Sequence, residues 1–196
     1  MNTNIKYLFT ILFCFYFLGC KKENPNLDEF NKLSSSLPIL KTPYVINCGL
    51  ERDENHNYLN IDSAYKSTIL PENCFFVGRL YKEQSFVTIM CGGVGADYYP
   101  LFFTFTSHGQ KIDSLIIYGN CDCYPPCEVT HVVIIDSNKT ISVIDTLCAV
   151  KRDSLDNIIK GSDSTFINQS EFSLTSTGHF IKIKDYKSVS KGWLKK

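Results

Sequence analysis

The chain has 196 residues, enough for one domain of ordinary size. Hydrophobic residues make up 44% of it, which is enough for a core and excludes a chain disordered throughout. Its 20 basic residues balance its 20 acidic residues, and no basic stripe runs along it. We therefore expect no nucleic-acid partner.

The first 20 residues have the pattern of an export signal. Lys6 precedes an uncharged apolar run over residues 7–18. This run is too short to span a bilayer, which needs about 20 apolar residues, but it fits the central part of a signal peptide. Residues 17–20, Phe-Leu-Gly-Cys, resemble the lipobox of bacterial lipoproteins, although leucine is more usual in place of Phe17.

This resemblance implies that residues 1–19 are a lipoprotein signal peptide and that Cys20 becomes the lipidated N-terminus. Fatty acyl chains such as palmitate contribute about 0.8 kcal/mol per buried methylene. We therefore expect a protein of the bacterial cell envelope that contacts the membrane through this lipid, the outer membrane in preference to the inner one. Whether it faces the periplasm or the surface stays open. The alternative is an ordinary cleaved signal peptide, with Cys20 as a spare thiol.

The segment after the lipidated cysteine is predicted to be a tether with a short helix, together spanning residues 20–37. Asn26 is placed to cap a helix over Leu27–Leu33, with Asp28 and Glu29 in its first turn. A single β domain is expected over residues 38–190, followed by a C-terminal tail at 191–196.

Within the β domain, short apolar runs alternate with turn residues, which is typical of antiparallel strands. Four connections are of hairpin size, and such turns make successive strands antiparallel. The prediction is an all-β fold, an antiparallel meander forming a sandwich or partly open barrel. Residues 44–69 are predicted to add one or two further strands. The predicted strands are Cys74–Tyr81, Ser85–Cys91, Pro100–Thr106, Ile112–Tyr118, Val129–Ile135, Thr140–Leu147, Ser164–Thr175 and Phe180–Lys184.

The chain contains nine cysteines. Cys14 leaves with the signal and Cys20 is assigned to lipid. An exported compartment permits disulfides, so the remaining seven are candidates for structural bridges. Seven is odd, so at least one thiol is free or paired elsewhere, and spacing does not fix the connectivity. The candidates are Cys48, Cys74, Cys91, Cys121, Cys123, Cys127 and Cys148.

If successive hairpins reverse the chain, six of these seven cysteines fall at the pole opposite the tight turns, with Cys48 as the exception. The same pole carries the long connections 92–99, 119–128 and 149–163. Cross-links order long loops, so we expect the cysteines to staple loops over the open end of the β core.

No motif in the sequence predicts a metal, a cofactor or a catalytic residue. The cluster over residues 121–127 holds three cysteines, but neither a C-x₂-C pair nor a neighbouring histidine is present, so a zinc site is not expected. The histidines His56, His108, His131 and His179 are scattered. A triad assembled from distant residues stays open, because its members need not be adjacent in sequence.

These observations favour a non-enzymatic binding or structural module whose stapled loops contact an envelope or secreted protein. Tyr98, Tyr99 and Tyr124 are the expected anchors of that surface. The alternative is an envelope hydrolase or thiol enzyme at the same pole, which would need a histidine close to a nucleophile and a carboxylate. The oligomeric state is left open.

The hairpin patterning of the second half resembles that of small uncharacterised lipoproteins of Bacteroidota-type bacteria. The residues that carry this resemblance are Gly109–Leu115, Val132–Thr146 and the last hairpin around Gly178. It implies an envelope location and a β domain, and it supplies no catalytic or binding residues. The dense cysteine loops depart from that pattern.

Overall fold

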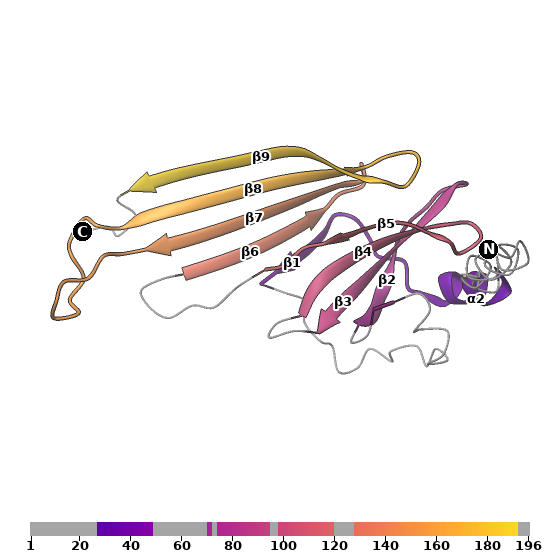
Figure 1. The fold of residues 1–196 in the computed structure, drawn as a ribbon, viewed down its shortest axis with the longest axis horizontal. Coiled ribbons are helices and arrows are strands. Elements are labelled where there is room, and N and C mark those ends of the chain that lie inside the picture. The colour runs from indigo at the N-terminus through magenta and orange to yellow at the C-terminus, as the bar shows by residue number, and fades with distance from the viewer. Residues whose placement is uncertain (1–26, 49–69, 72–73, 95–97, 120–127, 192–196) are drawn as a thin grey trace, which may run out of the picture.

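The protein folds into two antiparallel β-sheets and one short helix, as the computed structural model in Figure 1 shows. The structure describes residues 27–48, 70–71, 74–94, 98–119 and 128–191. One sheet has four strands in the order β2-β3-β4-β5, and the other has five in the order β1-β6-β7-β8-β9. The elements are α2 (Leu27–Ser36), β1 (Tyr44–Asn47), β2 (Cys74–Lys82), β3 (Phe86–Val94), β4 (Tyr98–Thr106), β5 (Lys111–Ile116), β6 (Glu128–Ile135), β7 (Thr140–Ala149), β8 (Ser164–Leu174) and β9 (Phe180–Lys191).

The predicted all-β fold is confirmed, as a sandwich of two open sheets and not a closed barrel. All eight predicted strands are present, and β1 is one of the further strands predicted for residues 44–69. The main difference is β9, which runs to Lys191 instead of ending at Lys184. Its second half is mostly exposed, so the backbone ladder with β8 and not an apolar pattern holds it in the sheet.

Helix α2 is three residues longer than predicted, because its last turn accepts hydrogen bonds from serine side chains. The Ser35 hydroxyl donates to the carbonyl of Asn31 at 2.7 Å, and the Ser36 hydroxyl donates to that of Leu33 at 2.8 Å. Asp28 and Glu29 lie in the first turn as predicted; Asn26, the predicted cap, lies outside the described residues. No helix among the described residues has the length and apolar character needed to cross a membrane.

Two hydrophobic clusters cover opposite faces of the four-stranded sheet, which therefore forms the middle layer. Side chains from α2 and the segment after it pack against one face, and those of the five-stranded sheet pack against the other. The first cluster contains Phe30, Leu33, Leu37, Leu70, Cys74, Val87, Ile89, Cys91, Leu101, Phe103 and Phe105. The second contains Ile46, Leu80, Met90, Phe102, Ile117, Val133, Ile135, Ile141 and Val143.

Strand β4 shows the consequence of this layering. In residues 101–106 a face of leucine and phenylalanine alternates with a face of one phenylalanine and two threonines, which is typical of a strand with one more deeply buried face, but in the structure both faces of β4 are buried. Phe102 is 0% exposed on one face and Phe103 is 2% exposed on the other. A nearly continuous apolar run is what a strand buried on both faces requires.

Helix α2 is fitted closely to the four-stranded sheet. Gly109, in the turn between β4 and β5, has φ +79°, and a Cβ added there would lie 2.8 Å from Cγ of Phe30. Only glycine combines this backbone conformation with so close an approach of the helix. The phenyl rings of Phe30 and Phe105 lie 5.5 Å apart, so the helix is part of the core.

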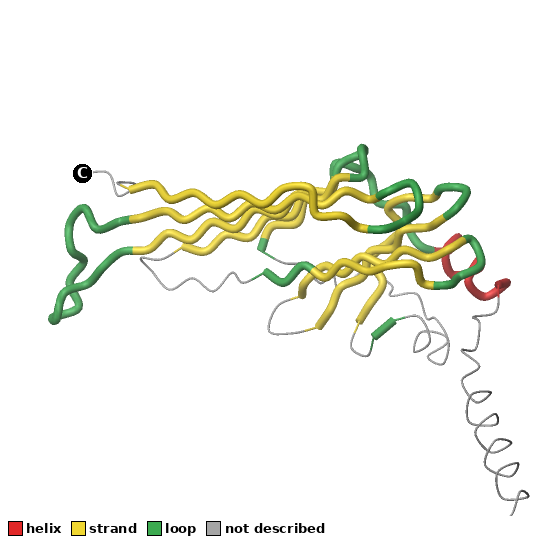
Figure 2. The backbone as a smooth tube through the Cα atoms, turned by 45° about the horizontal axis from the view of Figure 1, so that its top comes forward, coloured by secondary structure: helices red, strands yellow, loops and turns green. Residues whose placement is uncertain are grey.

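The tight turns lie toward the end of the molecule that carries α2, as Figure 1 shows. From there the five-stranded sheet continues far beyond the four-stranded sheet. Figure 2 shows β6 to β9 extending away from the red helix, with the β7–β8 connection at the far end. No described helix or strand covers the part of this sheet that lies from the His131–Asp145 pair outward. We call this part the projecting sheet; it consists of residues 128–131, 145–149, 164–168 and 187–191.

Candidate binding surface

The projecting sheet carries two parallel rows of side chains on the face that, nearer α2, forms the second cluster. Direct cross-strand partners share a face, and so do residues two apart along a strand. Val133 and Val143 are a core pair, and the next two rows follow at that spacing. The polar row is His131, Asp145, Asn168 and Lys187, and the apolar row beyond it is Val129, Leu147, Phe166 and Val189.

The apolar row is separated from the core by the polar row, so it cannot be buried as part of that core. Leu147 is 41% exposed, Phe166 38% and Val189 59%. Burying such a side chain completely stabilises a complex by about 1.5–3 kcal/mol, so partial cover of each contributes about 1 kcal/mol. A row of apolar side chains standing beside a polar row is the pattern of a contact surface.

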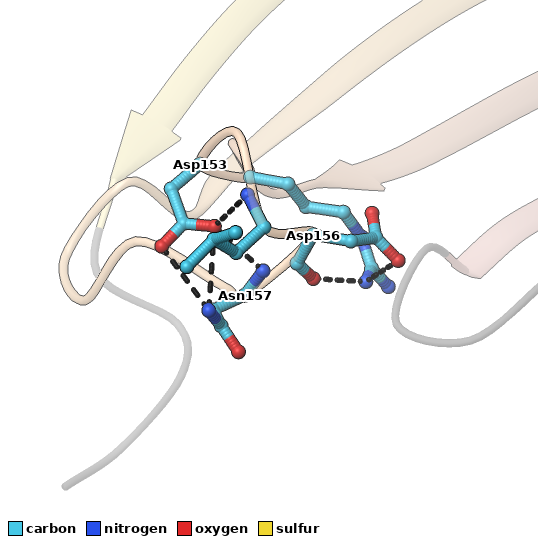
Figure 3. Close-up of polar contacts among 5 residues, drawn as sticks. Asp153, Asp156 and Asn157 are labelled. Carbon is cyan, nitrogen blue, oxygen red and sulfur yellow. Dashed lines mark hydrogen bonds and ion pairs between the residues drawn. The ribbon is translucent and has the colours of Figure 1, made fainter.

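Beyond the apolar row, the connection between β7 and β8 (residues 150–163, the tip loop) is ordered by its own side chains. Figure 3 shows that the Asp153 carboxylate accepts hydrogen bonds from the backbone N–H groups of Leu155 and Asn157, both at 2.9 Å. Arg152 donates to the backbone carbonyl of Asp156 at 2.8 Å. The hydrogen bond from the Asn157 backbone, with that from Leu155, lowers the pKa of Asp153.

The ordered tip loop presents apolar side chains to solvent. Leu155 is 80% exposed, and Ile158 and Ile159 are also exposed. The basic residues Lys151 and Lys160 are exposed beside them. A loop held in one conformation loses little conformational entropy when a partner binds. The tip loop and the apolar row together form the candidate binding surface.

In the polar row, the buried His131 pairs with Asp145, whose side chain is 45% exposed. Nδ1 of His131 lies 2.5 Å from Oδ1 of Asp145, and the His131 side chain is 1% exposed. Because a carboxylate only accepts hydrogen bonds, Nδ1 is the donor. Nε2 of His131 is buried with no hydrogen-bond partner among the described residues. A Cβ added to Gly119 would lie 2.3 Å from Cδ2 of His131, so residue 119 packs directly on the ring.

The sequence reasoning named His131 as one of four scattered histidines and missed Asp145 as its partner. The turn between β6 and β7 fixes a register in which Ile135 opposes Ile141, and this register places His131 opposite Asp145. Counting residues back from that turn would have found the pair. His108 and His179 lie exposed at tight turns, and His56 lies outside the described residues.

No disulfide joins any two of the described cysteines Cys74, Cys91 and Cys148. Cys74 and Cys91 are buried in the first cluster, on the α2 side of the four-stranded sheet. Cys148 lies on the projecting sheet, where its sulfur is 3.8 Å from Oγ1 of Thr165. These cysteines lie toward the strand ends away from the tight turns, but the two sheets extend different distances, so those ends are far apart. Cys121, Cys123 and Cys127 lie outside the described residues.

The predicted tyrosine anchors are only partly described. Tyr99 packs against the first cluster, and its ring lies 4.8 Å from that of Tyr118. Burial, together with the neighbouring Tyr118 and Cys74, raises the pKa of Tyr99. Tyr118 is the exposed member of this pair. The side chain of Tyr98, like Tyr124, lies outside the described part of the structure.

The described residues contain no group of three or more histidine, cysteine, aspartate or glutamate side chains that could hold a metal ion. No protein-family model, curated protein or solved structure matches this chain.

Proposed function

We propose that this chain is a lipid-anchored protein of the bacterial cell envelope that binds a protein partner through the apolar row and the tip loop. One observation carries the proposal: the exposed apolar side chains of β7, β8 and β9 line up in one row beyond the edge of the core. A row in this position lies outside the core, so contact with another molecule is the use that its chemistry supports.

The position of the surface supports a protein partner in preference to the anchoring membrane. Helix α2, which follows the predicted tether, lies at one end of the described molecule, and the tip loop lies at the other, as Figure 1 shows. A lipid on Cys20 would hold the α2 end near the bilayer. The apolar row would then point away from the lipids and toward neighbouring proteins.

Structural disulfides are part of the proposal. Cys48 is one of the predicted disulfide candidates, and its sulfur lies 4.0 Å from the carbonyl oxygen of Val129, the β6 member of the apolar row. A disulfide beside this row would limit the motion of the chain next to it and so reduce the entropy that binding costs. The exported location that we propose permits such bonds.

Site-specific photo-crosslinking in cells that produce the full chain tests the binding surface. A photoreactive residue replaces Phe166 or Leu155 in turn, and Ile39 is the matched control, since it is an exposed apolar residue near α2. We expect a discrete adduct from the first two positions and none from the control. Val189→Asp should remove the adduct formed at Phe166, because it places a charge beside that side chain in the same row.

Adducts of equal yield from all three positions would show contact without a preferred surface and would contradict the proposal. So would the persistence of the Phe166 adduct in the Val189→Asp chain.

Lipidation has its own test. Cells fed labelled palmitate should transfer label to the wild-type chain and not to a Cys20→Ser variant, which also lacks the acyl mass. Cys148→Ser is the matched control and should keep the label. Label retained after Cys20→Ser would show that Cys20 is not the lipid attachment site.

A second candidate function, an envelope hydrolase, has one observation in its favour. His131 donates Nδ1–H to Asp145 while Nε2 stays unpaired among the described residues, which is the orientation of a general base. Against it, the ring is 1% exposed and no described hydroxyl or thiol bonds to Nε2. A fluorophosphonate or iodoacetamide probe whose labelling is lost in His131→Gln, with the fold intact, would favour this candidate over the binding module.

A further inference from the structure

The five-stranded sheet ends at β9, which pairs with β8 on one side and with no described strand on the other. Along such an edge, alternate residues direct backbone N–H and C=O groups outward, ready to pair with another strand. We propose that a second copy of this chain pairs there, β9 against β9 and antiparallel, with Tyr186 of each copy opposite Tyr186 of the other. The inference goes beyond the proposed function and does not depend on it.

Charge complementarity selects this register. Opposed residues then have numbers that add to 372, so Asp185 of one copy faces Lys187 of the other, and the same pair recurs by symmetry. Lys182 faces Ser190 and Lys184 faces Ser188. No two like charges are directly opposed between Ile181 and Lys191. Opposite charges stabilise cross-strand pairs, and like charges destabilise them.

The four neighbouring registers each place two like charges directly opposite one another. Moving one strand by a single residue places Lys184 opposite Lys187 in one direction and Lys182 opposite Lys191 in the other. Moving it by two residues places Asp185 opposite Asp185, or Lys187 opposite Lys187. Charged residues on an edge usually prevent pairing; here they leave one register without a clash and oppose the four nearest alternatives.

The apolar side chains of β9 fit the same register. By residue count Ile183 faces Val189 of the second copy, although Ile183 is the extra residue at an irregularity of β9 opposite Glu171 and Phe172. Both side chains are more than half exposed in the single chain, at 56% and 59%. Val189 belongs to the apolar row, so the pairing extends that row across the junction. Apolar cross-strand pairs contribute to sheet stability as charge pairs do. The charge pairs and the apolar pair therefore favour the same register, with Tyr186 opposite Tyr186.

A two-fold axis normal to the sheet relates the copies, so both apolar rows lie on the same face of a ten-stranded sheet. The contact is limited to one strand edge, which places it among small and readily reversible interfaces. The pairing leaves the apolar rows open to a partner and doubles their number on one surface, which strengthens binding to a partner with two sites.

Engineered disulfides test the register in the full-length chain, produced in bacteria and oxidised in whole cells. Directly opposed antiparallel residues have Cα atoms about 4.5–5.5 Å apart, within the range that a disulfide bridges. Tyr186→Cys should therefore form a disulfide-linked dimer, roughly tenfold more than the wild-type chain with its native cysteines.

Val189→Cys is the matched control on the same strand. In the proposed register, residue 189 of one copy lies about 20 Å along the strand from residue 189 of the other, so this variant should not cross-link to itself. Mixed with chains carrying Ile183→Cys, it should form the dimer. Equal cross-linking of Tyr186→Cys and Val189→Cys, or none above wild type from Tyr186→Cys, would overturn the proposal.

A charge swap tests the pairing independently of geometry. In the Tyr186→Cys chain, Asp185→Lys should lower the yield of dimer about tenfold. The new lysine of each copy then faces Lys187 of the other copy, so two pairs of like charges are directly opposed. Adding Lys187→Asp should restore the yield to within about twofold. Asp156→Lys, the same charge change on the tip loop, should leave it unchanged. Failure of the swap to restore the dimer would overturn the charge argument.

The two proposals fail separately. Loss of the dimer with adducts still formed at Phe166 would remove only the β9 pairing. A dimer without those adducts would remove only the partner-binding function.

Discussion

The four-stranded sheet and the projecting sheet are built from similar strands and have opposite environments. The first is covered on both faces, by α2 and by the five-stranded sheet, and its central side chains are almost fully buried. The second has no described cover and exposes leucine, phenylalanine and valine. The difference shows that strand pairing and core burial are separate requirements. In the first sheet both hold the structure, whereas in the second the backbone ladder is joined by the His131–Asp145 pair and by apolar side chains that are only partly buried.

The largest expected difference between the two regions comes from deleting a phenyl ring. Phe103→Ala removes a fully buried ring and should lower the free energy of unfolding by about 3–5 kcal/mol. Phe166→Ala, on the apolar row, should lower it by less than about 1 kcal/mol, because the ring is partly exposed. Urea unfolding of both variants measures the contrast. Equal losses would mean that the projecting sheet is as much a part of the core as the four-stranded sheet.

The polar row lies between the core and the apolar row, and its His131–Asp145 pair tests how far stabilising contacts extend along the sheet. Asp145→Ala leaves Nδ1 of the buried His131 without its acceptor, and we expect a loss of about 1–2 kcal/mol. Asp156→Asn, on the exposed tip loop, is the control for removing a carboxylate charge; Asn tolerates the left-handed backbone of this residue (φ +66°), so the change should have almost no effect on urea unfolding. A loss no larger than that of the control would show that the pair does not stabilise the fold.

A smaller effect is expected from Tyr81, at the hairpin end where the sheets overlap. Burial, with Asp136 nearby, raises the pKa of Tyr81 from 10.0 to about 12. The folded state therefore disfavours the phenolate, so this contribution to stability is complete below pH 10 and is lost as the pH rises toward 12. The side chain is half-exposed and solvent screens it, so we expect roughly 1 kcal/mol.

Tyr81→Phe should remove this part of the alkaline decline, measured by urea unfolding between pH 9 and pH 11. The hydroxyl also donates a hydrogen bond to the backbone carbonyl of Asp136. The variant is therefore compared with wild type by the slope against pH, and not by stability at pH 7 alone. An unchanged slope would assign the decline to other groups.

The smallest effect on global stability is expected at the tip loop. Asp153→Ala removes the acceptor for two backbone N–H groups, so the amides of Leu155 and Asn157 should exchange faster with solvent while the unfolding midpoint stays unchanged. In the wild-type chain the same loosening should occur only at a pH below the ordinary pKa of an aspartate, because these hydrogen bonds lower the pKa of Asp153. Hydrogen exchange followed by mass spectrometry measures both. Exchange unchanged by Asp153→Ala would show that other contacts order the loop.

The strands and the antiparallel pairing were predictable, because alternation and turn residues are local signals. The end of β9 was not, because residues 185–191 lack an apolar period and are ordered by their neighbour β8. The layer order was not predictable either. Whether Phe102 and Phe103 both become buried depends on what covers each face, and spacing along one strand contains no information about that.

The candidate site was predicted less well than the fold. The cysteines were expected to mark a single pole, but Cys91 and Cys148 lie on sheets of different length, and the sequence does not say how far two packed sheets overlap. The pairing of His131 with Asp145 was available from the register of one hairpin. To predict the apolar row, the registers of β6 with β7, β7 with β8 and β8 with β9 must all be known. An error of one residue in any of them moves the side chains of a strand to the other face.

The way α2 is attached has a mechanical consequence. No backbone ladder joins the helix to the sheet; it is held by Phe30 and Leu33 and by the hydrogen bond from Arg79 to the Ser34 carbonyl. Under a pull between a lipid at Cys20 and a partner at the far end, these contacts would release before the strands. Ten residues would then lengthen from about 15 Å as a helix to about 35 Å extended. Unfolding of the helix would therefore take up the extension first and delay the loading of the β-sheets.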